Sequence, residues 1–118
     1  MITINEYVTV SKKRLKEIQF ITKLILDDLC LPEIIINIEP VSTMKQFGAD
    51  GMCCSSISID IVNKRSQKDL FKVIAHEMRH AYQYFNGIID KTTTEVVEKD
   101  AVDYENFTYE YHKKCFEG

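Results

Sequence analysis

The segment His76-Glu77-Met78-Arg79-His80 lies in the middle of a stretch whose apolar residues recur every three or four positions. That periodicity predicts a helix. Residues four apart on a helix share one face about one turn from each other, so the imidazoles of His76 and His80 can reach the same metal ion. The pattern H-E-x-x-H is typical of zinc sites in which the Glu takes a proton from a water molecule. We therefore predict that His76 and His80 bind zinc and that Glu77 acts as a general base.

The helix that carries this motif is predicted to extend from about residue 67 to residue 86. Ser66 and Asp69 fit the two ends of a capping box at its start, and Asn86-Gly87 supplies a C-terminal stop. Gln83 follows the second histidine by one turn, where it is a candidate hydrogen-bond partner of that ligand, with a surface amide as the alternative interpretation. The stripe predicted to be buried consists of Leu70, Ile74, Met78, Ala81 and Phe85.

The remaining segments predict one further helix on each side of the motif and several short strands. Ser11 caps a helix over residues 12–30, which ends before Pro32, and the final helix covers residues 93–115. Segments rich in β-branched residues predict strands at 33–39, 41–47 and 53–62, and residues 2–10 are either a strand or an irregular lead-in. The predicted fold class is α+β: a single domain, residues 1–118, with a small mixed or antiparallel sheet of about three strands packed on helices.

Composition excludes several classes of protein. The net charge of −3 and the scattered lysines give no basic surface of the kind that nucleic-acid binding requires. No run of about 18 apolar residues is present, so we expect neither a transmembrane helix nor a membrane partner. The N-terminus lacks a basic region followed by an apolar run and so does not look like a signal peptide, and we therefore expect a cytoplasmic location.

The four cysteines are Cys30, Cys53, Cys54 and Cys115. Their spacing matches neither a zinc knuckle nor a C-x-x-C redox pair. Without an export signal, free buried thiols are the favoured interpretation, with a disulfide as the alternative.

A catalytic zinc site needs a third protein ligand and one open position, and the motif supplies only two ligands. The candidates are the remaining histidine, His112, and the acids of the last helix. Those acids are Glu95, Glu98, Asp100, Asp103 and Glu105. Most of them must form the solvated face of an amphipathic helix, and the residues alone leave the choice open.

Together with the motif, the segment Glu98-Lys99-Asp100-Ala101 resembles the zincin superfamily, and in particular its gluzincin branch. In that branch the third ligand is a Glu on a later helix, often in an E-x-x-A setting whose small residue lets the two helices approach. The resemblance implies that Glu98 is the third ligand. The alternatives are Asp100, Glu95 and His112.

Residues 74–83 are also similar to the small metallopeptidase domains of the SprT-like and ImmA/IrrE-type groups, and this likeness covers roughly residues 53–112. The chain departs from those groups because it carries no zinc ribbon, no basic DNA-binding tail and no helix-turn-helix partner domain. Val102 stands where several gluzincins carry an Asp, which leaves Asp103 as a candidate hydrogen-bond partner of a ligand.

The resemblance implies a zinc-dependent metalloendopeptidase that holds one Zn²⁺ per chain and hydrolyses peptide bonds through a zinc-activated water. The strand at residues 57–62, in which Ile alternates with polar residues, is expected to lie beside the cleft and to pair with an extended peptide or protein substrate. Donors that could stabilise the oxyanion are Tyr104, Tyr109, Tyr111, Arg79 and His112. The alternatives are an inactive zincin-fold binding module with a structural zinc and a hydrolase that acts on something other than peptide. The sequence does not indicate an oligomeric state.

Overall fold

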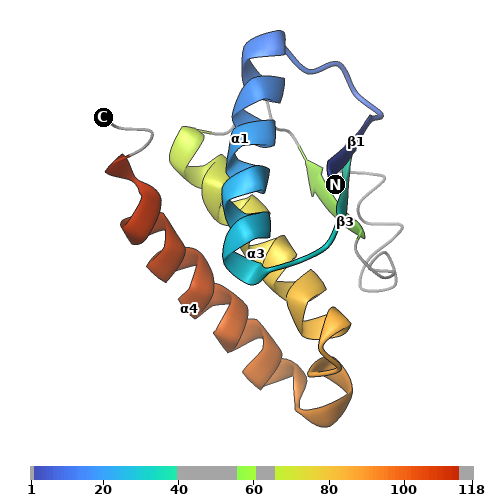
Figure 1. Ribbon diagram of the computed structural model, residues 1–118, viewed down its shortest axis with the longest axis vertical. Coiled ribbons are helices and arrows are strands. Elements are labelled where there is room, and N and C mark those ends of the chain that lie inside the picture. Colours follow the sequence, from blue (N-terminus) through green and yellow to red (C-terminus); the bar gives the residue numbers. More distant parts are fainter. Residues whose placement is uncertain (1, 40–55, 61–65, 115–118) are drawn as a thin grey trace.

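The computed structural model describes residues 2–39, 56–60 and 66–114 (Figure 1). Within these ranges the chain combines helices with a small sheet, which confirms the predicted α+β class. In chain order the elements are β1 (Ile2–Glu6), α1 (Lys12–Leu29), β2 (Ile34–Glu39), β3 (Ser56–Asp60), α3 (Gln67–Phe85), the 3₁₀ turn η3 (Ile89–Lys91) and α4 (Thr94–His112). The helices begin and end within about three residues of the predicted bounds.

Each helix begins at a Ser or Thr whose hydroxyl accepts a hydrogen bond from a backbone amide of the first turn. Ser11 accepts from the Arg14 amide at 3.1 Å, and Ser66 accepts from the Asp69 amide at 3.1 Å. Both predicted caps are therefore confirmed, and each satisfies an amide that has no partner inside its helix.

At its C-terminal end α1 stops at Cys30, which adopts a left-handed conformation with φ 54°. Cys30 is exposed there, so the prediction of a buried thiol is wrong for this residue, and the other cysteines lie outside the described ranges.

The three described strands form a parallel sheet in the order β1-β2-β3. The prediction of a mixed or antiparallel sheet is therefore wrong for these strands. For β1 and β2 the physical reason is α1, because a helix that carries the chain back between two neighbouring strands makes them parallel. The register sets Ile36 between Ile4 and Ile57. Residues 2–10 begin with a strand rather than an irregular lead-in, and the predicted strand at 41–47 lies outside the described residues.

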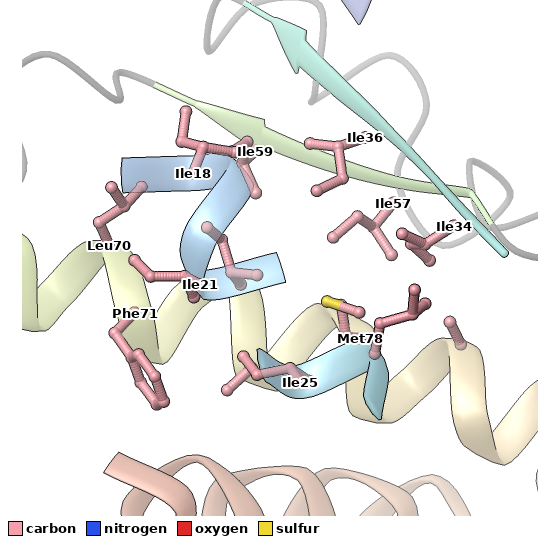
Figure 2. Close-up of a cluster of buried hydrophobic side chains, with 14 of the residues drawn as sticks. Ile18, Ile21, Ile25, Ile34, Ile36, Ile57, Ile59, Leu70, Phe71 and Met78 are labelled. Atoms are coloured by element: carbon pink, nitrogen blue, oxygen red, sulfur yellow. The ribbon is translucent and has the colours of Figure 1, made fainter. Parts of the chain in front are cut away.

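One face of the sheet packs against α1 and α3, and α4 lies on the side of α3 away from the sheet (Figures 1 and 2). Alternation along β2 divides its residues between the two faces of the sheet. Ile36 is fully buried under the helices, whereas its neighbour Ile35 is 38% exposed. Isoleucines from α1, β2 and β3 supply much of the core, and α3 adds larger side chains such as Phe71 and Met78 (Figure 2).

The buried stripe of α3 differs from the prediction at its C-terminal end. Phe85 is 57% exposed because α3 extends past the core there (Figure 1). Phe71, which the prediction omitted, is fully buried and packs the edge of its ring against Tyr109 of α4, with 5.7 Å between ring centroids. The other four predicted residues of the stripe are buried. α3 therefore buries two faces, one toward the sheet and α1 and the other toward α4.

Replacing Ile36 with Val should lower the free energy of unfolding by about 1 kcal/mol, because one methylene is lost from a site without room to relax. The matched change Ile35→Val, on the exposed face of the same strand, should cost less than about 0.5 kcal/mol. Both substitutions keep a β-branched side chain, so strand propensity is unchanged. Urea denaturation measures both values, and equal losses would contradict the assignment of the two faces.

Candidate metal centre

The motif helix α3 directs both histidines toward α4. The Nε2 atoms of His76 and His80 lie 3.1 Å apart, and their rings meet edge to face with centroids 4.7 Å apart. His80 is 8% exposed, and the His76 side chain is 20% exposed. The spacing of four residues therefore brings two imidazole nitrogens together at the edge of the helix–helix contact, as the sequence predicts.

Glu98 of α4 completes the group. Its Oε2 atom lies 3.3 Å from His76 Nε2, and its Oε1 atom lies 3.0 Å from His80 Nε2. A tetrahedral zinc with bonds of about 2.0–2.1 Å holds neighbouring ligand atoms roughly 3.3 Å apart. Glu98 is half exposed, so the group opens toward solvent on the side of the carboxylate. The three predicted ligand residues thus form a cluster that could hold a metal ion.

The second nitrogen of each imidazole is engaged on the opposite side of its ring. His76 Nδ1 lies 2.8 Å from Glu105 Oε1, and His80 Nδ1 lies 2.8 Å from Gln83 Oε1. Carboxylate and amide oxygens only accept hydrogen bonds, so each Nδ1 carries the proton in these contacts. In its neutral form, each ring then presents the lone pair of Nε2 toward Glu98. Three groups that carry lone pairs face one another, and a cation among them would turn this repulsion into attraction.

The orientation of the Gln83 side chain follows from its other contacts. Its Nε2 atom donates to the Val97 carbonyl at 3.1 Å and to Asp100 Oδ2 at 2.7 Å. A flipped amide would set its oxygen against two acceptors, so Oε1 must face His80. Gln83 is fully buried, which excludes the alternative interpretation of a surface amide and confirms the predicted contact with His80.

Asp100, one of the alternative third ligands, is held elsewhere. Arg79 donates to it through Nε at 2.8 Å and through Nη2 at 3.2 Å. The hydrogen bonds from Arg79 lower the pKa of the Asp100 carboxyl, and the bond from Gln83 acts in the same direction, while partial burial opposes both. Asp100 therefore stays ionised and paired instead of joining the histidine cluster.

The remaining alternative ligands also lie apart from the cluster. His112 is buried against α1, where its Nε2 lies 2.7 Å from Asp28 Oδ2. Glu95 is exposed in the first turn of α4. Asp103, the candidate partner of a ligand, accepts from Lys99 at 3.0 Å on the exposed face of the same helix. Glu98 is thus the predicted acid that the fold brings to the two histidines.

Glu105 is the residue that sequence reasoning missed as a partner of His76, although it belonged to the set of acids on the last helix. It follows Glu98 by seven residues, which is two helical turns, so both carboxylates lie on one face of α4. That spacing is the signal that could have identified it. The two acids contact the two nitrogens of the same imidazole, Glu98 at Nε2 and Glu105 at Nδ1.

Glu77 lies beside the cluster on the next position of α3 and is partly buried. Burial raises the pKa of its carboxyl, the neighbouring His80 and His76 lower it, and the negative charges of Glu98 and Glu105 raise it further. The net effect is a raised pKa. This is the direction that suits a carboxylate that must accept a proton and later release it near neutral pH.

The proposed oxyanion donors are dispersed. Arg79 is bound to Asp100, Tyr109 is buried, and Tyr111 is 73% exposed. The Tyr104 hydroxyl is buried, and this burial raises the pKa of the hydroxyl to about 12, although a side-chain hydrogen bond with Thr108 acts in the opposite direction. Within the described ranges, the structure selects no one of these residues as the donor.

Comparisons with models of protein families, with curated proteins and with solved structures find no match. In the described part of the chain, no helix is both long and apolar enough to cross a membrane.

Glu105→Ala should weaken zinc binding by about 10- to 100-fold, because His76 loses the acceptor that fixes its ring and the proton on Nδ1. The matched change Glu110→Ala removes an exposed acid from the same helix, which pairs with Lys113, and should leave the affinity unchanged. Competition against a chromophoric chelator gives both dissociation constants. Equal affinities for the two variants would show that Glu105 does not support the ligand.

Proposed function

We propose that this chain is a zinc-dependent metallopeptidase of the zincin type. The observation that carries the proposal is the convergence of His76, His80 and Glu98, with the Nδ1 atom of each histidine tied to an acceptor on the far side of its ring. Two imidazoles and one carboxylate are a donor set that suits zinc. Three protein ligands leave one tetrahedral position for water or substrate, as catalytic zinc sites do.

The chemistry divides between the metal and the chain. Bound zinc would lower the pKa of a coordinated water and polarise the substrate carbonyl. Glu77 would accept the proton of the attacking water and pass it to the leaving amine. The placement of Glu77 next to His76 in sequence and its raised pKa both support this role. Glu105 and Gln83 would keep the two imidazoles in the tautomer that the metal requires.

An extended peptide is the substrate that best suits the sheet. Among the described strands, β3 lies at an edge and pairs only with β2. β3 also packs against α3, the helix that carries the motif. An edge strand offers unpaired backbone amides and carbonyls, which can bind a peptide in an extended conformation. This supports peptide hydrolysis over hydrolysis of a small molecule.

The wild-type chain, purified without added metal, should contain one zinc per chain, and Glu98→Ala should lose it because only two ligands remain. Glu95→Ala removes an exposed acid from the first turn of the same helix and should keep the full content. Elemental analysis of the three proteins tests the site. A wild-type chain that carries no zinc and binds none on titration would overturn the proposal.

Glu77→Gln should retain zinc but lose peptide cleavage by about 10²- to 10⁴-fold, because the amide cannot accept the proton of the attacking water. Mass spectrometry of a mixed peptide library incubated with each protein measures the loss, and circular dichroism checks the fold. If the wild type binds zinc but cleaves no peptide faster than Glu77→Gln does, the metal has a structural role. The chain would then act as a binding module.

A further inference from the structure

We propose that Arg79 is a positioning residue that sets the metal affinity of the centre by acting on His80 through Asp100 and Gln83. This inference rests on the proposed zinc site. Arg79 occupies one of the two motif positions that the H-E-x-x-H pattern leaves free. Its side chain does not reach the metal ligands but is connected to one of them by three successive contacts.

The first contact is a two-point ion pair between helices. Arg79 of α3 donates two hydrogen bonds to Asp100 of α4, one to each carboxylate oxygen. Its guanidinium also lies 4.5 Å from the ring centre of Tyr82 and 5.0 Å from that of Tyr104. A guanidinium held by two aromatic rings and a carboxylate has little freedom to rotate. It therefore fixes the position of the Asp100 carboxylate, which is otherwise 41% exposed and free to turn toward solvent.

The second contact passes this constraint to Gln83. Asp100 Oδ2 accepts a hydrogen bond from Gln83 Nε2 at 2.7 Å. Because the Gln83 side chain is fully buried, this contact fixes which end of the amide faces Asp100. Once that nitrogen faces Asp100, the amide oxygen faces His80. A buried amide that loses this acceptor keeps the Val97 carbonyl as its remaining acceptor but has one N–H group unpaired, which is costly, so its orientation is less well fixed and it can turn or shift.

The third contact sets the state of the ligand. Gln83 Oε1 lies 2.8 Å from His80 Nδ1, so His80 keeps its proton on Nδ1 and offers the lone pair of Nε2 to a metal. A turned Gln83 would present N–H to Nδ1 instead and favour the tautomer with a proton on Nε2, so that Nε2, the atom that faces Glu98, could not bind a metal. Arg79 thus acts on metal binding through the tautomer of His80.

Arg79→Met keeps much of the apolar stem but removes both donors, and it should weaken zinc binding by about 10- to 100-fold. Arg79→Lys should recover part of the loss, because an ammonium can hold one carboxylate oxygen but lacks the planar fork. Lys72→Met is the matched control, since it removes another contact from α3 to α4, the 2.8 Å bond to Asn106, without touching the relay. It should leave the zinc affinity unchanged even if it lowers stability to a similar extent.

A double-mutant cycle separates a relay from a general loss of packing. On a Gln83→Met background, Arg79→Met should have little further effect on zinc affinity, because the hydrogen-bonded route to His80 through Gln83 is already cut. The absorption spectrum of the Co²⁺-loaded protein should change in Arg79→Met and remain as in the wild type in Lys72→Met. Circular dichroism and the melting temperature of the metal-free proteins check that each variant folds.

Two results would overturn the role of Arg79: wild-type zinc affinity in Arg79→Met, or an equal loss of affinity from that change in the wild-type and Gln83→Met backgrounds. Both presuppose a wild type that binds zinc, so they leave the proposed function intact. A wild type that binds neither Zn²⁺ nor Co²⁺ would be a different result, because it overturns the proposed function and the role of Arg79 with it.

Discussion

The antiparallel packing of α4 against α3 is the contact on which the candidate centre depends. Ala75 and Ala101 are fully buried, and side chains of this size let two helix backbones approach closely. Because the helices are antiparallel, contacts at increasing residue numbers along α3 involve decreasing residue numbers along α4. These are Lys72 with Asn106, His76 with Glu105, Arg79 with Asp100, and Gln83 with Val97. A shift of α4 by one turn would separate Glu98 from both histidines.

The contact between α3 and α4 contains many polar groups, and the hydrogen bonds among these groups favour one arrangement of the two helices. Gln83 uses both amide hydrogens and its oxygen, which join Val97, Asp100 and His80. A buried polar group without a partner is costly, so a network in which each member is paired favours one arrangement of the helices over alternatives. At its far end α4 is tied to α1 by the contact between His112 and Asp28. The third histidine therefore belongs to the helix packing, whereas the other two belong to the centre.

Short-range signals in the sequence predict the helices and the residues of the candidate centre that lie on α3. Caps at Ser11 and Ser66 and a 3.6-residue period depend on neighbours within about four positions, so they are visible without a fold. The predicted direction of the strands is wrong, because pairing between distant segments does not follow from the composition of the strands; for β1 and β2 it follows from the crossover by α1. The exposure of Phe85 has a similar cause, since the end of the core is not marked in the sequence of α3.

The sequence by itself determined that His76 and His80 face the same way with Glu77 beside them, because helix geometry fixes residues four apart. It also restricted the third ligand to a few residues, from which the family resemblance, and not the spacing, selected Glu98. Only the tertiary structure decided what the acids of α4 do: Glu98 at Nε2 of both histidines, Glu105 at Nδ1 of His76, and Asp100 at Arg79. The physical reason is that one helix orders its own side chains through local geometry, whereas contacts between two helices depend on their axial shift and rotation. The buried surfaces of the whole fold set those two quantities.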